Sequence, residues 1–299
     1  MSDFGGQDQS GGRVKEINST ANPIVKDIKG LFLKKNRDAS GLFIAEGLKL
    51  VADALETGWK IKTLIYSKNT LGQKGLAEIA ARCRAKGADI LEVNDKVLTA
   101  ISRRDNPQTI IGVFHQSWSN VDEIAQKTKS NSDVIVALDR VRDPGNLGTI
   151  LRTCDAVGVK GILLIGETTD PFSIEATRAT MGSVFHVPMA RMSESEFLEW
   201  RKTFKGRIAG THLEGAADYR KIDWQASPTL LLMGNEQQGL TDALAETCDD
   251  VVIIPMAGKA DSLNLAIATG VMLFEIRRSS LTLETHSFAN SFEKKADTK

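Results

Sequence analysis

The second half of the chain alternates short, unbroken apolar runs with segments of helical periodicity. Unbroken apolar runs are typical of strands buried on both faces, whereas apolar residues repeated every three to four positions are typical of helices. The predicted strands are 134–138, 161–165, 185–189, 207–210, 230–233 and 251–255, and the predicted helices are 147–157, 174–181, 194–204, 240–246 and 262–278. This order predicts an α/β domain with a mostly parallel sheet that is covered by helices.

A smaller α/β module precedes this domain. Its predicted helices are 23–33, 48–55 and 76–86, and its predicted strands are 42–47, 61–66, 90–93 and 110–114. Glycine-rich and polar segments lie outside the two patterns. We therefore expect a disordered tail over 1–14, a first domain over 15–116, a linker over 117–131, a second domain over 132–280 and a polar tail over 281–299.

Composition is that of an ordinary globular protein, with 41% hydrophobic and 25% charged residues. No apolar run is long enough to predict a membrane span, and the polar start does not resemble a secretion signal. The three cysteines are far apart in sequence and form neither a metal-binding pair nor a disulfide framework, so we expect a reducing cytoplasm.

Charge is distributed unevenly, although the formal net charge is zero. Residues 13–115 contain 18 Lys and Arg against 11 Asp and Glu, whereas the rest of the chain contains 20 against 27. A basic first domain indicates a polyanionic partner, and nucleic acid is the commonest one. The alternative is a charged surface that only contacts solvent.

Three strand-to-helix junctions carry small, amide and charged residues. In the first, a strand ends near Asp139, a Pro-Gly turn follows, Asn146 stands where a helix N-cap is expected, and Arg152 lies further along the helix. Arginine is unusual in so apolar a helix. The local alternative is that Asn146 only caps the helix and that Arg152 pairs with Asp155 or another acid.

The second junction contains Glu236 between Gly234 and Gly239, and it matches neither a phosphate-binding loop nor the dinucleotide fingerprint. The third runs from Ile254 through a small-residue loop into a helix that Asp261 or Ser262 could cap, with Asn264 in its first turn. Each junction alone could be an ordinary turn. Together they predict one composite site, because ligand sites in α/β proteins lie at the carboxyl ends of strands.

The three junctions resemble the three motifs of the SpoU (TrmH) family. These are N-x-G-x-x-x-R at Asn146, Gly148 and Arg152, G-N-E-x-x-G from Gly234, and I-P-M followed by S-L-N-x-A-x-A-x-G between 254 and 270. The resemblance covers about residues 132–280 and implies a SPOUT-class RNA ribose 2′-O-methyltransferase domain with a trefoil knot. Residues 15–115 are similar, more weakly, to the small RNA-binding domains of ribosomal proteins that bind kink-turns.

The resemblance also implies the cofactor and the site. The expected cofactor is S-adenosylmethionine, and no metal is expected. The residues implied to bind it are Gly234, Ile254, Leu263, Thr211, His212 and Asn264, and the residues implied for catalysis are Arg152, Asn146, Glu236, Ser262 and Asn264. Relatives of this kind are homodimers in which the partner subunit completes the active site.

The resemblance makes Arg152 the residue that activates the ribose hydroxyl. Arginine is a poor base, because a guanidinium ion loses its proton only above about pH 12. Either an RNA phosphate assists proton removal while Arg152 orients the group, or a desolvated Arg152 removes the proton itself. We favour orientation and charge stabilisation, with Glu236 as a second orienting residue.

The separate basic first domain resembles that of the rRNA-directed members of the family more than the tRNA enzymes, so the resemblance implies 23S ribosomal RNA as the substrate. The alternatives are a transferase acting on tRNA ribose, a resistance-type enzyme acting on ribosomal RNA, and a non-catalytic RNA-binding assembly protein of the same fold. A nicotinamide-dependent dehydrogenase is excluded, because no strand end carries the required glycine fingerprint.

Overall fold

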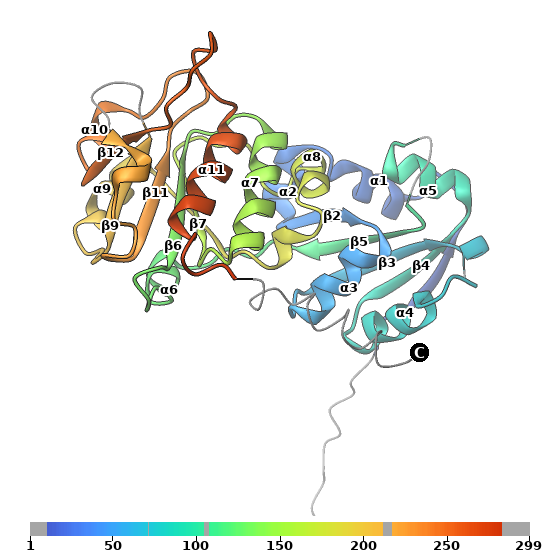
Figure 1. Ribbon diagram of the computed structural model, residues 1–299. Helices are drawn as coiled ribbons and strands as arrows, with labels where there is room; N and C mark the ends of the chain where they lie inside the picture. The colour runs from blue at the N-terminus through green and yellow to red at the C-terminus, as the bar shows by residue number, and fades with distance from the viewer. Residues whose placement is uncertain (1–10, 71, 105–107, 212–216, 283–299) are drawn as a thin grey trace, which may run out of the picture. The chain divides into compact units, whose positions relative to one another are not determined.

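The computed structural model describes residues 11–70, 72–104, 108–211 and 217–282 (Figure 1). The chain forms two compact units. Unit 1 contains the chain up to Ser117 together with the segment Asp170–His186, and unit 2 contains Trp118–Thr169 and the chain from Val187 onwards. Most of the predicted tails, 1–14 and 281–299, lies outside the described residues.

Unit 1 contains a five-stranded mixed sheet in the order β1-β4-β3-β5-β2. The strands are β1 (Val14–Ile17), β2 (Leu42–Glu46), β3 (Ile61–Ser67), β4 (Asp89–Val93) and β5 (Ile110–His115), and β5 runs antiparallel to both neighbours. The helices are α1 (Pro23–Gly30), α2 (Lys34–Ser40), α3 (Leu48–Glu56), α4 (Leu76–Ala85) and α5 (Asp95–Ser102). Figure 1 shows α1 and α5 on one side of this sheet and α3 and α4 on the other.

Two differences from the predicted elements have local causes. The pattern over 23–33 predicts one helix, but α1 ends at Gly30 and α2 begins at Lys34. Glycine is a poor helix former, so the chain turns here at little cost. The short edge strand β1 was not predicted, because only Ile17 of its four residues is buried and no apolar run marks it.

The segment Asp170–His186 gives unit 1 part of its core. It contains α8 (Ile174–Ala179) and the 3-10 helix Ser183–Phe185. Its rings Phe172 and Phe185 lie 4.7 and 6.0 Å from the ring of Phe43 on β2. The predicted strand over 185–189 is therefore wrong: the first part of that run is buried in an aromatic cluster, and strand β8 begins only at Met189.

Two buried or half-buried ion pairs also join this segment to the rest of unit 1. The Nε atom of Arg37 lies 2.7 Å from Oδ2 of Asp170, and both side chains are more than nine-tenths buried. Arg178 donates through Nε and Nη2 to the two carboxylate oxygens of Glu46, each at 3.0 Å. Charged groups are buried at a low cost only when they are paired in this way. The apolar pattern gives no indication of these contacts between residues far apart in the sequence.

Unit 2 confirms the predicted α/β fold. Its seven strands pair in the order β10-β12-β9-β11-β6-β7-β8, and every pair is parallel. The strands are β6 (Val134–Asp139), β7 (Ile162–Ile165), β8 (Met189–Met192), β9 (Arg207–Thr211), β10 (Ala217–Asp218), β11 (Thr229–Met233) and β12 (Asp250–Ile253). The central strands β6, β7 and β11 are fully buried, as unbroken apolar runs predict.

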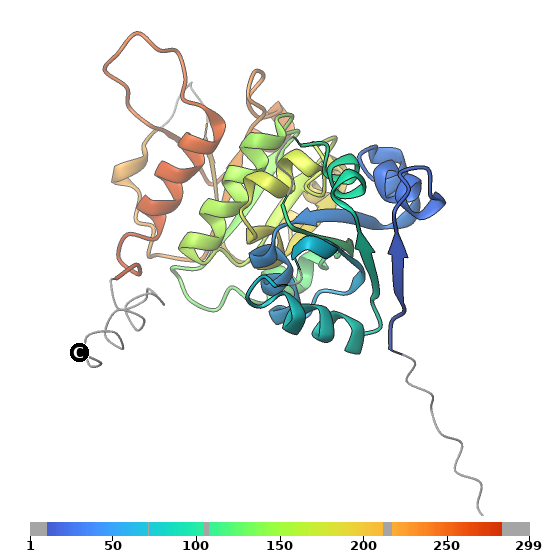
Figure 2. The ribbon, with the colours of Figure 1, turned by 90° about the vertical axis from the view of Figure 1, so that its right-hand side faces the viewer.

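The helices of unit 2 are α6 (Val121–Ala125), α7 (Pro144–Val157), α9 (Glu194–Arg201), α10 (Asp242–Ala245) and α11 (Leu265–Ile276). Helices α7 and α11 lie side by side in both views (Figures 1 and 2) and pack directly against each other. At Gly270 of α11 an added Cβ would lie 3.9 Å from the methyl group of Thr153 on α7, which is an ordinary van der Waals contact, so packing at this point does not require glycine.

Asp133 holds the start of β6 and is expected to make the fold sensitive to acid. Burial raises the pKa of this carboxyl, but the backbone N–H groups of Ser130 and Lys129 and the ammonium of Lys160 lower it overall. A pKa that is lower in the folded state stabilises the fold above the unfolded value, and this stabilisation is lost as pH falls through the folded pKa.

We therefore expect Asp133→Asn to lower the free energy of unfolding by about 1–3 kcal/mol at pH 7, because it weakens buried, charge-assisted hydrogen bonds. The difference from the unchanged protein should shrink below about pH 4. Urea unfolding across pH 3–8 measures this, with the exposed Asp242 changed to Asn as the control. A difference that does not depend on pH would contradict an electrostatic origin of the effect.

Candidate functional site: a cofactor cavity at the carboxyl edge of the sheet

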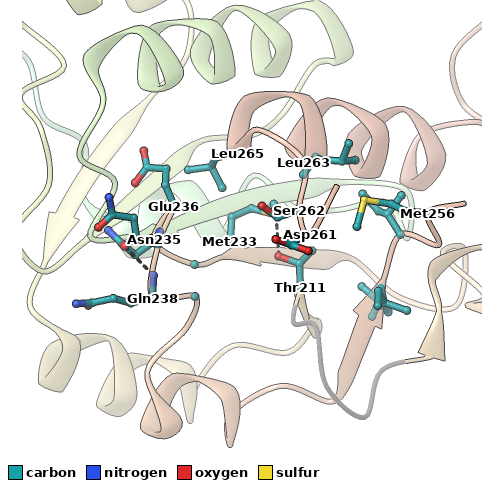
Figure 3. Close-up of a pocket in the computed structure, with 17 residues that line it drawn as sticks. Thr211, Met233, Asn235, Glu236, Gln238, Met256, Asp261, Ser262, Leu263 and Leu265 are labelled. Carbon is teal, nitrogen blue, oxygen red and sulfur yellow. Dashed lines mark hydrogen bonds between the residues drawn. The ribbon is translucent and has the colours of Figure 1, made fainter. Parts of the chain in front are cut away.

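A cavity of about 470 Å³ lies where β9, β11 and β12 end (Figure 3). This volume suits a ligand of cofactor size. Its walls come from three separated parts of the chain, namely the end of β9, the loop after β11, and the segment from β12 to the start of α11. The lining residues are Thr211, Met233, Gly234, Asn235, Glu236, Gln237, Gln238, Gly239, Val252, Ile253, Ile254, Met256, Asp261, Ser262, Leu263, Leu265 and Ala268.

The loop after β11 is closed tightly on itself. The N–H and carbonyl groups of Asn235 and Gly239 exchange two hydrogen bonds of 3.0 Å, and the Asn235 side chain accepts from the N–H groups of Gln237 and Gln238. A Cβ added to Gly234 would lie 2.3 Å from the carbonyl carbon of Gly239. Only glycine fits there, so the backbone of this loop can form one wall of the cavity.

Glu236 connects the second junction to the first. Its carboxylate accepts from the backbone N–H groups of Arg142 and Asp143 and from the Asn146 side-chain amide, each at 3.3 Å. The carboxylate lies at the N-terminal end of α7, where a negative charge is favourable. Glu236 thereby holds the start of α7 against the rim of the cavity.

Asn146 connects the first two junctions to the third. Its side-chain oxygen accepts a hydrogen bond of 2.9 Å from the amide of Asn264. Glu236, Asn146 and Asn264 therefore form one chain of hydrogen bonds, although they are separated by 90 and 118 positions in sequence. The predicted convergence of the three junctions is thus observed in the structure.

The two helix caps differ from the expected ones. Asp143, not Asn146, caps α7, because its Oδ1 atom accepts from the Asn146 N–H at 2.6 Å. This leaves the Asn146 side chain free to bond Glu236 and Asn264. Asn264 itself caps α11 by accepting from the N–H groups of two following residues, so the helix begins at Leu265 and not at Ser262. Ser262 lies in the loop that lines the cavity.

Arg152 lies apart from the cavity of its own chain. Its side chain is exposed on α7, on the same helix face as the exposed Thr149 and Ala156, and it is not among the cavity-lining residues. The unusual arginine in an apolar helix is therefore explained by its position on the exposed face of that helix. Residues three, four and seven apart share a helix face, so this face of α7 points to solvent within the described chain.

The other expected site residues are distributed as follows. Gly234, Ile254, Leu263, Thr211, Glu236 and Ser262 line the cavity, whereas Asn146 and Asn264 border it through the hydrogen bonds above. His212 lies outside the described residues. The structure adds Met233, Met256 and Asp261 as lining residues, which side-chain type alone did not distinguish from ordinary loop positions.

Arg140 is a further residue that the sequence did not single out. Its guanidinium makes a two-point contact of 2.9 Å with the buried carboxylate of Asp139 and also donates to Gln238 Oε1 at 2.9 Å. The hydrogen bonds and charge of Asp139 raise the pKa of Arg140. The Arg140 carbonyl in turn accepts from the Asn235 amide at 2.9 Å. Arg140 thereby ties the end of β6 to the cavity loop.

Two features are absent from the residues that the structure describes, which are 11–70, 72–104, 108–211 and 217–282. No group of three or more His, Cys, Asp or Glu side chains in those ranges could hold a metal ion. No helix among them is long and apolar enough to cross a membrane.

Comparison with known proteins identifies the family and the fold. Residues 133–274 match the SpoU rRNA Methylase family, and residues 22–112 match the MRM3-like substrate binding domain. A 23S rRNA (guanosine(2553)-2′-O)-methyltransferase of Bacillus subtilis is 31% identical over 264 residues, which are 88% of this chain and 100% of that protein.

Solved structures agree with this result. An AdoMet-bound rRNA methyltransferase from Sinorhizobium meliloti is 54% identical with a TM-score of 0.84, and the match covers 91% of this chain and 100% of that one. The SpoU methyltransferase AviRb from Streptomyces viridochromogenes, in complex with AdoMet, is 29% identical with a TM-score of 0.77, over 87% and 98% of the two chains.

The parallel sheet and the cavity at its carboxyl edge define an α/β methyltransferase of the SPOUT class. The chain belongs to the SpoU rRNA methylase family. It is accordingly an RNA ribose 2′-O-methyltransferase that uses S-adenosylmethionine.

Proposed function

We propose that the enzyme methylates a ribose 2′-hydroxyl of 23S ribosomal RNA in the cytoplasm. The observation that carries this proposal is the hydrogen-bonded chain of Glu236, Asn146 and Asn264, which brings all three family motifs to one cavity. The choice of 23S rRNA is supported by the relatives from Bacillus subtilis and Streptomyces viridochromogenes, both named as 23S rRNA 2′-O-methyltransferases. The substrate-binding domain matched in unit 1 supports a structured RNA.

The cavity residues fit S-adenosylmethionine, which has a flat base at one end and charged amino-acid groups at the other. Met233, Ile254 and Leu263 offer apolar surface, whereas Thr211 and Ser262 offer hydroxyl groups. The backbone at Gly234, Ile254 and Leu263 holds the cofactor, with Thr211, His212 and Asn264 beside it. When bound, the cofactor supplies a methyl group activated by a sulfonium sulfur. Membership of the SpoU family supports the proposal that the loops around the cavity belong to a trefoil knot.

Transfer needs an oriented hydroxyl and an acceptor for its proton. Arg152 orients the ribose and the adjoining phosphate, and that phosphate assists removal of the hydroxyl proton. Asn146, Glu236, Ser262 and Asn264 keep the surrounding loops in place, because three of them already bond one another. A guanidinium suits this role, since its planar donors match phosphate oxygens and it keeps its positive charge.

The active enzyme is a homodimer, in which Arg152 reaches the cavity of the other copy. Ile267 and Phe274 are each 56% exposed, and their spacing of seven places them on one stripe of α11. Helix α11 packs against α7, which carries the exposed Arg152. Exposed apolar side chains in a row favour burial against another surface. A second copy both covers them and explains why Arg152 lies outside its own cavity.

Replacing Ile267 and Phe274 together with Glu is expected to produce a monomer, because charged groups cannot be buried unpaired in an interface. Light scattering after gel filtration measures the mass, and methyl transfer should fall at least tenfold with it. Val14→Glu, at a residue that is 50% exposed on β1, is the control that should leave the dimer intact. A dimeric, fully active double variant would contradict the interface.

The reaction itself is tested by incubating the enzyme with labelled S-adenosylmethionine and either 23S rRNA or total tRNA, followed by mapping of 2′-O-methyl positions. Labelling of one ribose in 23S rRNA is the expected result. Labelling of tRNA alone would overturn the substrate, and binding of RNA without labelling would indicate a non-catalytic assembly protein.

A further inference from the structure

The end of α5 in unit 1 places an arginine where glycine would be more stable. Arg103 is the C-cap residue of α5 and has a φ of 53°, in the left-handed region that costs most side chains about 1 kcal/mol. Glycine is the usual residue at such a position. The side chain of Arg103 is exposed and forms no ion pair with a carboxylate of the described residues. An arginine kept in this conformation points to a use for its side chain.

The Arg103 guanidinium lies over an aromatic ring. Its central carbon lies 4.0 Å from the centroid of Phe32, and Phe32 itself is half-buried against the core beneath α1 and α5. The inner face of the guanidinium is therefore covered by Phe32, and the exposed side chain presents its other face to solvent. A planar cation held in one orientation loses little freedom when a flat ligand stacks on it.

The residues close to Phe32 in sequence are basic and partly apolar. Leu33, next to Phe32, is 52% exposed. Lys29 and Lys35 lie three positions before and after Phe32, and both are at least partly exposed without an ion pair to a described carboxylate. Positive charge beside a stacking surface is the combination that proteins use for unpaired nucleic-acid bases.

We propose that Arg103 on Phe32 is a stacking platform for an unpaired base of the RNA substrate, with Lys29 and Lys35 contacting the flanking phosphates. This rests on the proposed function and assigns the contact in unit 1 through which the RNA is held. A duplex does not fit the platform, because its bases are stacked on one another and their faces are covered. The platform therefore selects a loop, a bulge or a single strand of the RNA substrate.

The test uses the full chain with a 12-nucleotide oligoadenylate and, for comparison, a 12-base-pair RNA duplex, measured by fluorescence anisotropy. Arg103→Gly removes the guanidinium and suits the left-handed backbone, so its melting temperature should be unchanged or higher. We expect it to bind the single strand about tenfold more weakly and the duplex less than threefold more weakly. Arg103→Lys keeps the positive charge but removes the planar guanidinium. Its affinity for the single strand should therefore fall about fivefold, without a change in the salt dependence of binding.

The matched control is Lys86→Ala, which removes one exposed charge after α4, a helix whose buried residues lie outside the core cluster of α1 and α5. It should change binding of either RNA less than twofold. Two results would contradict stacking and indicate nonspecific electrostatic binding instead. One is an equal loss of single-strand affinity in Arg103→Gly and Lys86→Ala, and the other is an Arg103→Lys variant that binds the single strand like the unchanged protein. Equal losses on the single strand and the duplex would also overturn it.

The failure of this platform and the failure of the proposed function give different results. If the unchanged protein methylates 23S rRNA but Arg103→Gly binds oligoadenylate normally, only the platform is wrong. If Arg103→Gly loses single-strand binding while no RNA is methylated by the unchanged protein, the platform stands and the proposed reaction fails.

Discussion

Replacing Arg152 with alanine is expected to lower the rate of methyl transfer by about 10²–10³-fold while changing the affinity for S-adenosylmethionine less than twofold. In other enzymes, removing one hydrogen-bond donor that stabilises the transition state lowers the rate by a factor of this order. Cofactor affinity should be retained, because Arg152 does not line the cavity of its own chain and is proposed to contact the ribose and phosphate of the RNA at the other copy's cavity. Single-turnover transfer measures the rate and titration calorimetry measures the affinity. Thr149→Ala, on the same exposed face of α7, is the control that should keep full activity.

Mixing two inactive variants tests whether Arg152 acts across the dimer. A chain with Arg152→Ala keeps an intact cavity, and a chain with a damaged cavity keeps Arg152. If Arg152 serves the other copy, the mixed dimer regains one complete site and up to half of the normal activity per dimer. Weakened cofactor binding in Arg152→Ala would place the residue in the cofactor pocket, and no recovery on mixing would place its action within one chain.

The second large effect is expected at Gly234. A Cβ at this position would lie 2.3 Å from the Gly239 carbonyl carbon and 2.4 Å from the Leu240 nitrogen, so the backbone must move. We expect Gly234→Ala to weaken S-adenosylmethionine binding by about 10- to 100-fold, which corresponds to the 1–3 kcal/mol of strain typical of overpacking. Transfer at low cofactor concentration should fall by the same factor.

Gly258 provides a matched control for this change. It lies in another loop near the cavity, and an added Cβ there would meet no atom within 4 Å. Calorimetry should therefore give Gly258→Ala the affinity of the unchanged protein. Similar losses in both variants would mean that loop flexibility, and not the close contact at Gly234, controls cofactor binding.

The sequence predicted the sheet of unit 2 well because its central strands are buried on both faces. A short unbroken apolar run between helical segments, such as 230–233, is typical of a strand in this setting. The run at 185–189 is also largely apolar but fails as a strand, since Phe185 is buried by aromatic rings of unit 1. Periodicity reports that a residue is buried but not which partner buries it.

The sequence predicted which loops form the site, but it did not predict the role of each residue in them. The three junctions meet as expected, because the carboxyl ends of parallel strands share one edge of the sheet. The caps were misassigned, since Asp143 and Asn146 are equally good cap residues and only the backbone geometry distinguishes them. The trefoil knot, the catalytic roles, the dimer and the domain boundaries stay predictions.

Because two separate segments of the chain form unit 1, the substrate-binding domain of this protein cannot be exchanged as one continuous segment. A substrate-binding domain transferred as residues up to 117 alone would leave Phe43 and Trp59 without Phe172 and Phe185, and Arg37 without its buried carboxylate. A working hybrid must also carry the segment Asp170–His186 from the same parent. Recombination at one crossover therefore breaks a hydrophobic core, and changes of RNA specificity are expected to arise by point substitution on the surface of unit 1.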